Sequence, residues 1–144
     1  MMPAGKYYVG DLCYVMHDCW DEFCDITIKG NECLDGEFTL KDGRRFATYG
    51  TMYGDGLYAS NIGTMHSVDA GLIGCILVDD IRDPEATPTA MASMGAVVDF
   101  DTDFVTGSGP TGTIQFGRVV IETGGDDYED EYDGQPDEAQ ESGC

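Results

Sequence analysis

The run Leu72–Val78, LIGCILV, constrains the fold of this 144-residue chain more than any other segment. It is apolar on both faces and rich in β-branched residues, which is typical of a strand covered on both sides. The run therefore predicts the middle of a sheet or of a sandwich core. Glycine beside aspartate or asparagine just upstream indicates tight turns, because glycine adopts positive φ without steric cost. The turns and short strands predicted to lead into the run are Gly54–Gly56, Leu57–Ser60, Asn61–Thr64 and Met65–Val68.

A β-hairpin is predicted at Glu37–Tyr49. If Lys41–Gly43 forms a three-residue loop with its glycine in the left-handed conformation, Phe38 lies opposite Phe46. A two-residue Asp42–Gly43 turn would instead place the two phenylalanines on opposite faces. The three-residue loop is therefore the preferred register.

A short helix is predicted near residues 18–29. Asp18 can cap its N-terminus, and Trp20, Phe23 and Cys24 then fall on one face at helical spacing. A helix of about two turns is marginal alone, so packing of this face has to stabilise it.

The rest of the chain predicts mostly strands. Lys6–Met16 indicates one strand with a bulge, or two short strands, in a central position. Asp79–Gly95 contains charges, two prolines and small residues, which indicate a long surface loop with a helical turn near 90–94. Further strands are predicted at Ala96–Phe100, Thr113–Phe116 and Arg118–Thr123. Together these elements predict an all-β or β-dominated α+β fold, an antiparallel sandwich or a partly open barrel with one short helix near residues 18–29.

Acidic residues outnumber basic ones by 28 to 7, which gives a formal net charge of -21. Such a chain repels phosphate backbones and anionic lipids, which argues against direct binding of nucleic acid or of a membrane surface. Nine of the acids follow Glu122, where there is no lysine or arginine. Residues 124–144 are therefore predicted to be an acidic disordered tail that follows a β-rich globular domain at residues 1–123. The tail residues predicted to engage a partner are Asp126, Asp127, Glu129, Asp130 and Glu131.

The sequence predicts a cytoplasmic protein. It contains no recognisable signal peptide, and no apolar run approaches the roughly 20 residues of a membrane span. In a reducing cytoplasm the six cysteines are expected to be free thiols rather than a disulfide framework.

Metal-ligating residue types occur, but their spacing does not match a metal site. The cysteines and His17 lack a C-x2-C pair, so the cysteines are interpreted as small apolar residues rather than zinc ligands. Asp99, Asp101 and Asp103 alternate along one segment, yet a calcium loop beginning at Asp99 would lack its glycine and its final glutamate. No metal and no other cofactor is therefore predicted.

No catalytic residue is predicted either. Cys13 or Cys75 could serve as a nucleophile with His17 or His66 as its base, but an acidic field raises the pKa of a thiol and disfavours the thiolate. The polar residues at the turns around Leu57–Ser60 are interpreted mainly as turn geometry, with a small polar pocket as the alternative. The residues of that candidate ligand pocket are Asp55, Tyr58, Asn61, His66 and Asp69.

Four short sequence motifs in the first half of the chain are similar to motifs in other proteins: Tyr7–Val15, Trp20–Cys24, Thr51–Tyr58 and Val68–Gly74. Together they resemble a group of small uncharacterised proteins of phages, bacteria and large DNA viruses of algae and protists. The group has no established activity, so the resemblance supplies no catalytic residues. It implies a virus-encoded or virus-associated protein, located in the host cytoplasm or in the virion.

Three functional hypotheses follow. The preferred one is a non-enzymatic, virus-associated interaction protein, in which a β scaffold carries a polyanionic tail that engages a basic partner. The second is a minor structural protein of the virion, whose β surface contacts other virion components. The third is a small-ligand-binding protein or enzyme that uses the polar turns around Asp55 and Asp69. An acidic surface that serves solubility alone would need no partner.

Overall fold

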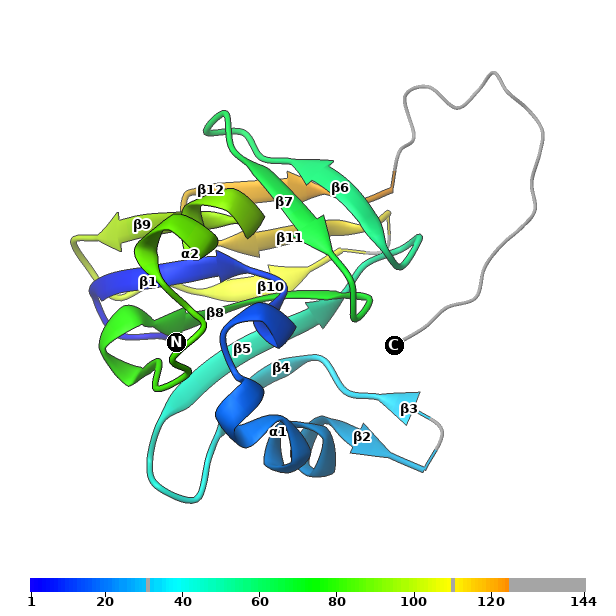
Figure 1. Cartoon of the computed structure of the whole chain (residues 1–144). Coiled ribbons are helices and arrows are strands. Elements are labelled where there is room, and N and C mark those ends of the chain that lie inside the picture. The colour runs from blue at the N-terminus through cyan, green and yellow to red at the C-terminus, as the bar shows by residue number, and fades with distance from the viewer. Residues whose placement is uncertain (31, 110, 125–144) are drawn as a thin grey trace.

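The computed structural model describes residues 1–30, 32–109 and 111–124 of the chain (Figure 1). The tail residues predicted to engage a partner, Asp126 to Glu131, lie outside the described residues.

A five-stranded antiparallel sheet forms the centre of the molecule. The strands, in their order across the sheet, are β4 (Gly36–Thr39), β5 (Arg45–Gly50), β8 (Leu72–Leu77), β1 (Gly5–Gly10) and β9 (Ala96–Phe100). The apolar run of the sequence becomes β8, the middle strand, and Lys6–Met16 supplies β1 beside it. Both central positions are therefore confirmed.

A second, three-stranded sheet packs against one face of the first, and we call this the sandwich side. Its strands are β10 (Thr106–Ser108), β11 (Thr113–Phe116) and β12 (Val119–Glu122). Side chains alternate across a strand, so Tyr7 of β1 and Cys75 of β8 turn to this side, where they pack with Ile114 and Phe116 of β11. All four are fully buried, so this side is a closed apolar core.

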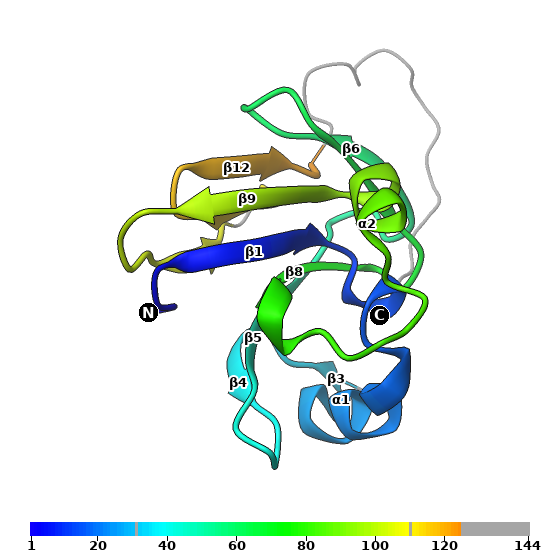
Figure 2. The ribbon, with the colours of Figure 1, turned by 60° about the vertical axis from the view of Figure 1, so that its left-hand side comes forward.

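Helical segments cover the opposite face, which we call the helix side. The helices α1 (Trp20–Thr27) and α2 (Pro88–Met94) lie near different ends of the sheet (Figure 2). Four aromatic rings stack in a row from α1 to the sheet. Trp20 and Phe23 of α1 stack at 4.4 Å between centroids, and Phe23 stacks on Phe46 of β5 at 5.0 Å. Phe46 in turn stacks on Phe38 of β4 at 5.6 Å. The remaining short elements are η1 (Leu12–Tyr14), η2 (His17–Cys19), η3 (Val78–Asp80), β2 (Ile28–Lys29), β3 (Glu32–Cys33), β6 (Gly56–Ala59) and β7 (Met65–Val68).

The predicted β-dominated α+β class is confirmed, and no sheet in the described residues closes into a barrel. The predicted hairpin register is also confirmed. Phe38 pairs with Phe46, and the loop is closed by the Leu40 amide, which donates to the carbonyl of Arg44 at 2.8 Å. Gly43 in that loop has a φ of 96°, as the three-residue loop requires.

The sequence prediction was wrong or incomplete in four places. The strand predicted over Lys6–Met16 ends at Gly10, where the Asp11 side chain caps the 3-10 helix η1. The helix predicted near residues 18–29 is α1, but Asp18 does not cap it, because Cys19 occupies the N-cap position without a side-chain hydrogen bond.

The segment interpreted as a loop with one helical turn contains α2, which starts earlier because the Thr87 hydroxyl caps it and Pro88 occupies its first turn. The segment between the predicted strands Ala96–Phe100 and Thr113–Phe116 contains a further strand, β10, which pairs with β11. Backbone pairing with a strong neighbouring strand overrides the low strand propensity of Thr106–Ser108.

Candidate functional site

The five residues of the predicted polar pocket all lie on or beside the hairpin β6–β7, which crosses the end of the central sheet (Figure 1). Tyr58 pairs directly with His66, so the structure brings these two side chains together on the inner face of the hairpin. Asp55 and Asp69 flank the open end, where Gly56 pairs with Val68, whereas Asn61 occupies the turn at the other end. The five residues are therefore divided between the two ends and the inner face of the hairpin.

His66 is fully buried, and both of its ring nitrogens are hydrogen-bonded. Nδ1 lies 3.0 Å from the carbonyl oxygen of Val9, which can only accept, so Nδ1 carries the proton. Nε2 then accepts from the Thr64 hydroxyl at 2.7 Å, and the Thr64 hydroxyl lies 2.6 Å from that of Ser60. Burial lowers the pKa of His66, partly offset by the bond to Val9, so the ring is neutral. The geometry makes His66 a link between β7 and β1.

Tyr58 and Asn61 also hold the hairpin in place. The Tyr58 hydroxyl donates to the carbonyl of Gly54 at 2.9 Å. The Asn61 side chain accepts from the amide of Val120 at 2.8 Å and donates to the carbonyl of Arg118 at 2.9 Å, which ties the turn to β12. The hairpin is therefore fastened to the body at its turn and along its inner face.

Asp11 is a buried residue beside this hairpin whose role the sequence analysis missed. Its carboxylate is fully buried and accepts backbone N–H groups of Asp69 and Ala70 at 2.6 Å each, and of Cys13 at 2.9 Å. Burial raises the pKa of Asp11, while these hydrogen bonds act in the opposite direction. The sequence did contain a signal for this role: Asp11 is an aspartate inside the apolar segment Lys6–Met16. A charged side chain buried with such a segment needs hydrogen-bond partners. Asp11 therefore fixes the segment between β7 and β8.

The outer face of the hairpin is exposed and apolar. Leu57, Ala59, Met65 and Ser67 point outward, because they alternate with the inward Tyr58 and His66; we call these four residues the hairpin face. Leu57 is 61% exposed and Met65 is 46% exposed, and Ile62 at the turn adds a further exposed apolar side chain. Asp55 and Asp69 border this face at its open end.

A second set of titratable groups lies where η2 meets the segment between η3 and α2. Asp83 is buried, accepts the backbone N–H of His17 at 2.9 Å, and contacts the His17 ring at Nδ1. Burial raises the pKa of Asp83, but hydrogen bonds from Glu85 and His17 outweigh it and hold that pKa below its usual range. A carboxylate that orients a histidine occurs in catalytic triads. Among the described residues, however, no hydroxyl or thiol is hydrogen-bonded to the His17 ring.

The cysteines in the described part of the chain do not resemble activated nucleophiles. Cys13, Cys19, Cys24 and Cys75 are free thiols. Burial raises the pKa of Cys19 to about 11 and raises those of Cys13 and Cys75 further. Thiols with raised pKa values remain protonated at neutral pH and are poor nucleophiles.

Two kinds of feature are absent from the described residues. These residues contain no group of three or more His, Cys, Asp or Glu side chains that could hold a metal ion. They also contain no helix long and apolar enough to cross a membrane.

Comparisons with known proteins give no match to a protein-family model, to a curated protein or to a solved structure. Function therefore has to follow from the contacts, burial and charge of the residues themselves.

Proposed function

We propose that this protein is a non-enzymatic interaction protein that binds a basic partner through the hairpin face, with its acidic C-terminal residues adding electrostatic attraction. The observation that carries the proposal is the hairpin face, where Leu57 and Met65 stand exposed on a two-stranded element. A group of exposed apolar side chains rimmed by charge is typical of a protein contact surface.

The hairpin suits this role because its inner side is firmly held. His66 is bonded to Val9, and Asn61 is bonded to β12. A surface that is already ordered loses little conformational entropy on binding, so more of the contact energy contributes to affinity.

The charge of the chain selects the class of partner. The formal net charge is -21, and Asp55 and Asp69 border the hairpin face. Opposite charges accelerate encounter, and like charges placed across an interface are strongly unfavourable. A basic protein surface with an apolar centre therefore complements this face best.

A synthetic amphipathic helix of lysine and leucine is a suitable probe, with polylysine as the probe that lacks an apolar face. We expect the lysine–leucine helix to bind more tightly, and the double variant Leu57→Ser, Met65→Ser to lose about tenfold in affinity for it, which corresponds to about 1.4 kcal/mol. Val105→Ser is the matched control, because Val105 is 57% exposed but lies on the connection between β9 and β10. Equal loss in both variants, or no loss in either, would contradict the proposed role of the hairpin face.

The acidic C-terminal residues are tested separately with a chain that ends at Gly124. Removing nine acids should weaken binding of both probes at low salt and reduce the dependence of affinity on salt. Equal binding by the shortened and full chains at low salt would exclude a role for these residues. The role of the hairpin face is tested independently, by the Leu57 and Met65 variants.

A further inference from the structure

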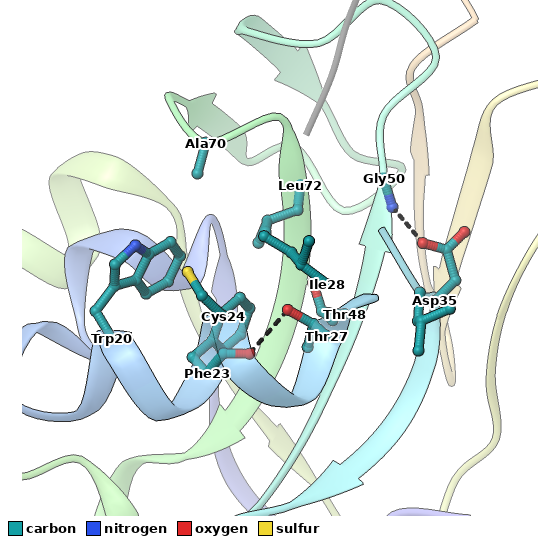
Figure 3. Close-up of a pocket in the computed structure, with 11 residues that line it drawn as sticks. Trp20, Phe23, Cys24, Thr27, Ile28, Asp35, Thr48, Gly50, Ala70 and Leu72 are labelled. Carbon is teal, nitrogen blue, oxygen red and sulfur yellow. Dashed lines mark hydrogen bonds between the residues drawn. The ribbon is translucent and has the colours of Figure 1, made fainter. Parts of the chain in front are cut away.

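An apolar cavity of about 230 Å³ lies on the helix side, between α1 and the strands β5 and β8 (Figure 3). Trp20, Cys24 and Thr27 of α1 line one wall, and Leu72 of β8 and Thr48 of β5 line the other. The cavity is a different part of the molecule from the hairpin face, so an occupant would represent a second binding function.

Thr48 lines this cavity and carries a buried hydroxyl without a partner. The residue is only 2% exposed, and within the described part of the chain its hydroxyl is the single buried side-chain polar atom that lacks a hydrogen-bond partner. The strand register explains why. Its cross-strand neighbours are Gly36 on β4 and Gly74 on β8, and neither offers a side chain on that face.

A buried hydroxyl without a partner is unfavourable, and a ligand that hydrogen-bonds to it removes this cost. The neighbouring hydroxyl and carboxylate already have hydrogen-bond partners. The Thr27 hydroxyl donates to the carbonyl of Phe23 at 2.8 Å, and Asp35 at the rim accepts the amide of Gly50 at 3.0 Å. Among the described side chains that line the cavity, Thr48 is thus the one with a buried polar atom that has no partner.

The surroundings indicate an uncharged ligand. Burial raises the pKa of Cys24, so its thiol is neutral and adds no charge to the wall. Asp35 and the net charge of -21 both disfavour an anion. A cation would have to leave water for a wall made mainly of apolar side chains, which is costly without a charged partner inside.

Size and wall chemistry narrow the ligand further. An apolar cavity of about 150 Å³ holds one benzene molecule, so 230 Å³ holds a single ring with a short substituent. The stacked rings of Trp20 and Phe23 provide an aromatic wall, against which another ring packs favourably.

We propose that this cavity binds an uncharged aromatic molecule of one ring, whose single hydroxyl group hydrogen-bonds to Thr48 Oγ1. The ring lies among Trp20, Cys24 and Leu72. Thr48 acts as acceptor or donor, because a hydroxyl can do either.

The chain carries its own reporter for this site, because Trp20 is its only tryptophan and lines the cavity. The probes are p-cresol and toluene, which differ by one hydroxyl group. Tryptophan emission is excited where p-cresol does not absorb, and the thermal midpoint of unfolding is measured in parallel. We expect p-cresol to bind about tenfold more tightly than toluene in the natural protein.

Two variants complete the test. Thr48→Val keeps the shape of the side chain and removes the hydroxyl, so it should bind both probes with equal, toluene-like affinity. Ala70→Leu fills the mouth of the cavity and should abolish binding of both; the hydrogen bond of Ala70 to Asp11 uses the backbone and is retained. The proposal is overturned if neither probe changes the emission or the midpoint, if the natural protein binds both probes equally, or if Thr48→Val retains the preference for p-cresol.

Discussion

The two faces of the central sheet are built from the same strands, yet they are filled differently. On the sandwich side, Phe116, Ile114 and their partners are fully buried against Tyr7 and Cys75. On the helix side, α1 leaves a cavity of about 230 Å³ and an unpaired hydroxyl at Thr48. The strands β10, β11 and β12 close the sandwich side, whereas short, separate helical segments cover the helix side and leave the cavity beside α1. We infer from this difference that the sandwich side supplies most of the stability, whereas the helix side has room for a ligand.

The largest expected effect comes from truncating a ring on each side. Phe116→Ala should lower the free energy of unfolding by about 4–5 kcal/mol, because the closed core cannot collapse around the space left behind. Phe23→Ala should cost less, about 3 kcal/mol, because Trp20 can move into the space beside an existing cavity. Urea denaturation measures both. The reverse order would show that the helix side is the more tightly packed one.

Asp11→Ala should have the next largest effect, a loss of roughly 3 kcal/mol. The change leaves the buried N–H groups of Asp69 and Ala70 without their acceptor and loosens the segment that forms the mouth of the cavity. Asp99→Ala, an exposed aspartate on β9, is the control and should change stability by less than about 0.5 kcal/mol. Similar values for the two variants would mean that the buried carboxylate does not hold this side together.

The pH dependence of stability tests the link that His66 makes between the hairpin and β1. The pKa of His66 is lowered in the folded state, so the unfolded state binds more protons as the pH falls below the ordinary histidine value of about 6.5. Stability should therefore be fully present above that pH and decrease below it, by at most about 1.4 kcal/mol per pH unit for one proton.

His66→Asn keeps a donor for the Val9 carbonyl but cannot titrate, so its stability should be flatter between pH 7 and pH 5. Asp99→Ala, the exposed control used above, keeps His66 and should retain the decrease of the natural protein. An unchanged slope in His66→Asn would show that another group causes the acid sensitivity.

The smallest expected effect is that of Thr48→Val on the protein without ligand. Removing a buried hydroxyl that has no partner should leave stability unchanged or raise it by up to about 1 kcal/mol. Thr27→Val is the control, since its hydroxyl is bonded to Phe23 and its loss should destabilise by about 1 kcal/mol. A clear loss of stability in Thr48→Val would imply that the hydroxyl already has a partner in solution.

Local patterns in the sequence predicted the elements of the fold well. The bounds of β7, β9 and β11 agree with the predicted strands, and the loop at Lys41–Gly43 gave the pairing of Phe38 with Phe46. These features depend on residues close together in the chain, where turn geometry and alternation determine the result. The sequence predicted a central position for β1, but not that β8 and β9 flank it, because that depends on pairing between distant segments.

The candidate site was harder to predict for the same reason. The sequence placed Asp55, Asn61 and His66 on turns and strands correctly, but it gave no sign that His66 is bonded to Val9 or Asn61 to β12. The hydroxyl of Thr48 lacks a partner because the register across three strands places Gly36 and Gly74 beside it. Each of these glycines alone is indistinguishable from a turn or strand-end glycine.

The difference between the two sides of the sheet is tested most directly by amide chemical-shift mapping of the nitrogen-15-labelled protein during a titration with p-cresol. The expected result is a set of shifts confined to the helix side, at the amides of Cys24, Thr48 and Leu72, with those of Ile114 and Phe116 unchanged. Shifts centred on β11, or no shifts at concentrations up to the solubility of p-cresol, would contradict a closed sandwich side and an open, ligand-binding helix side.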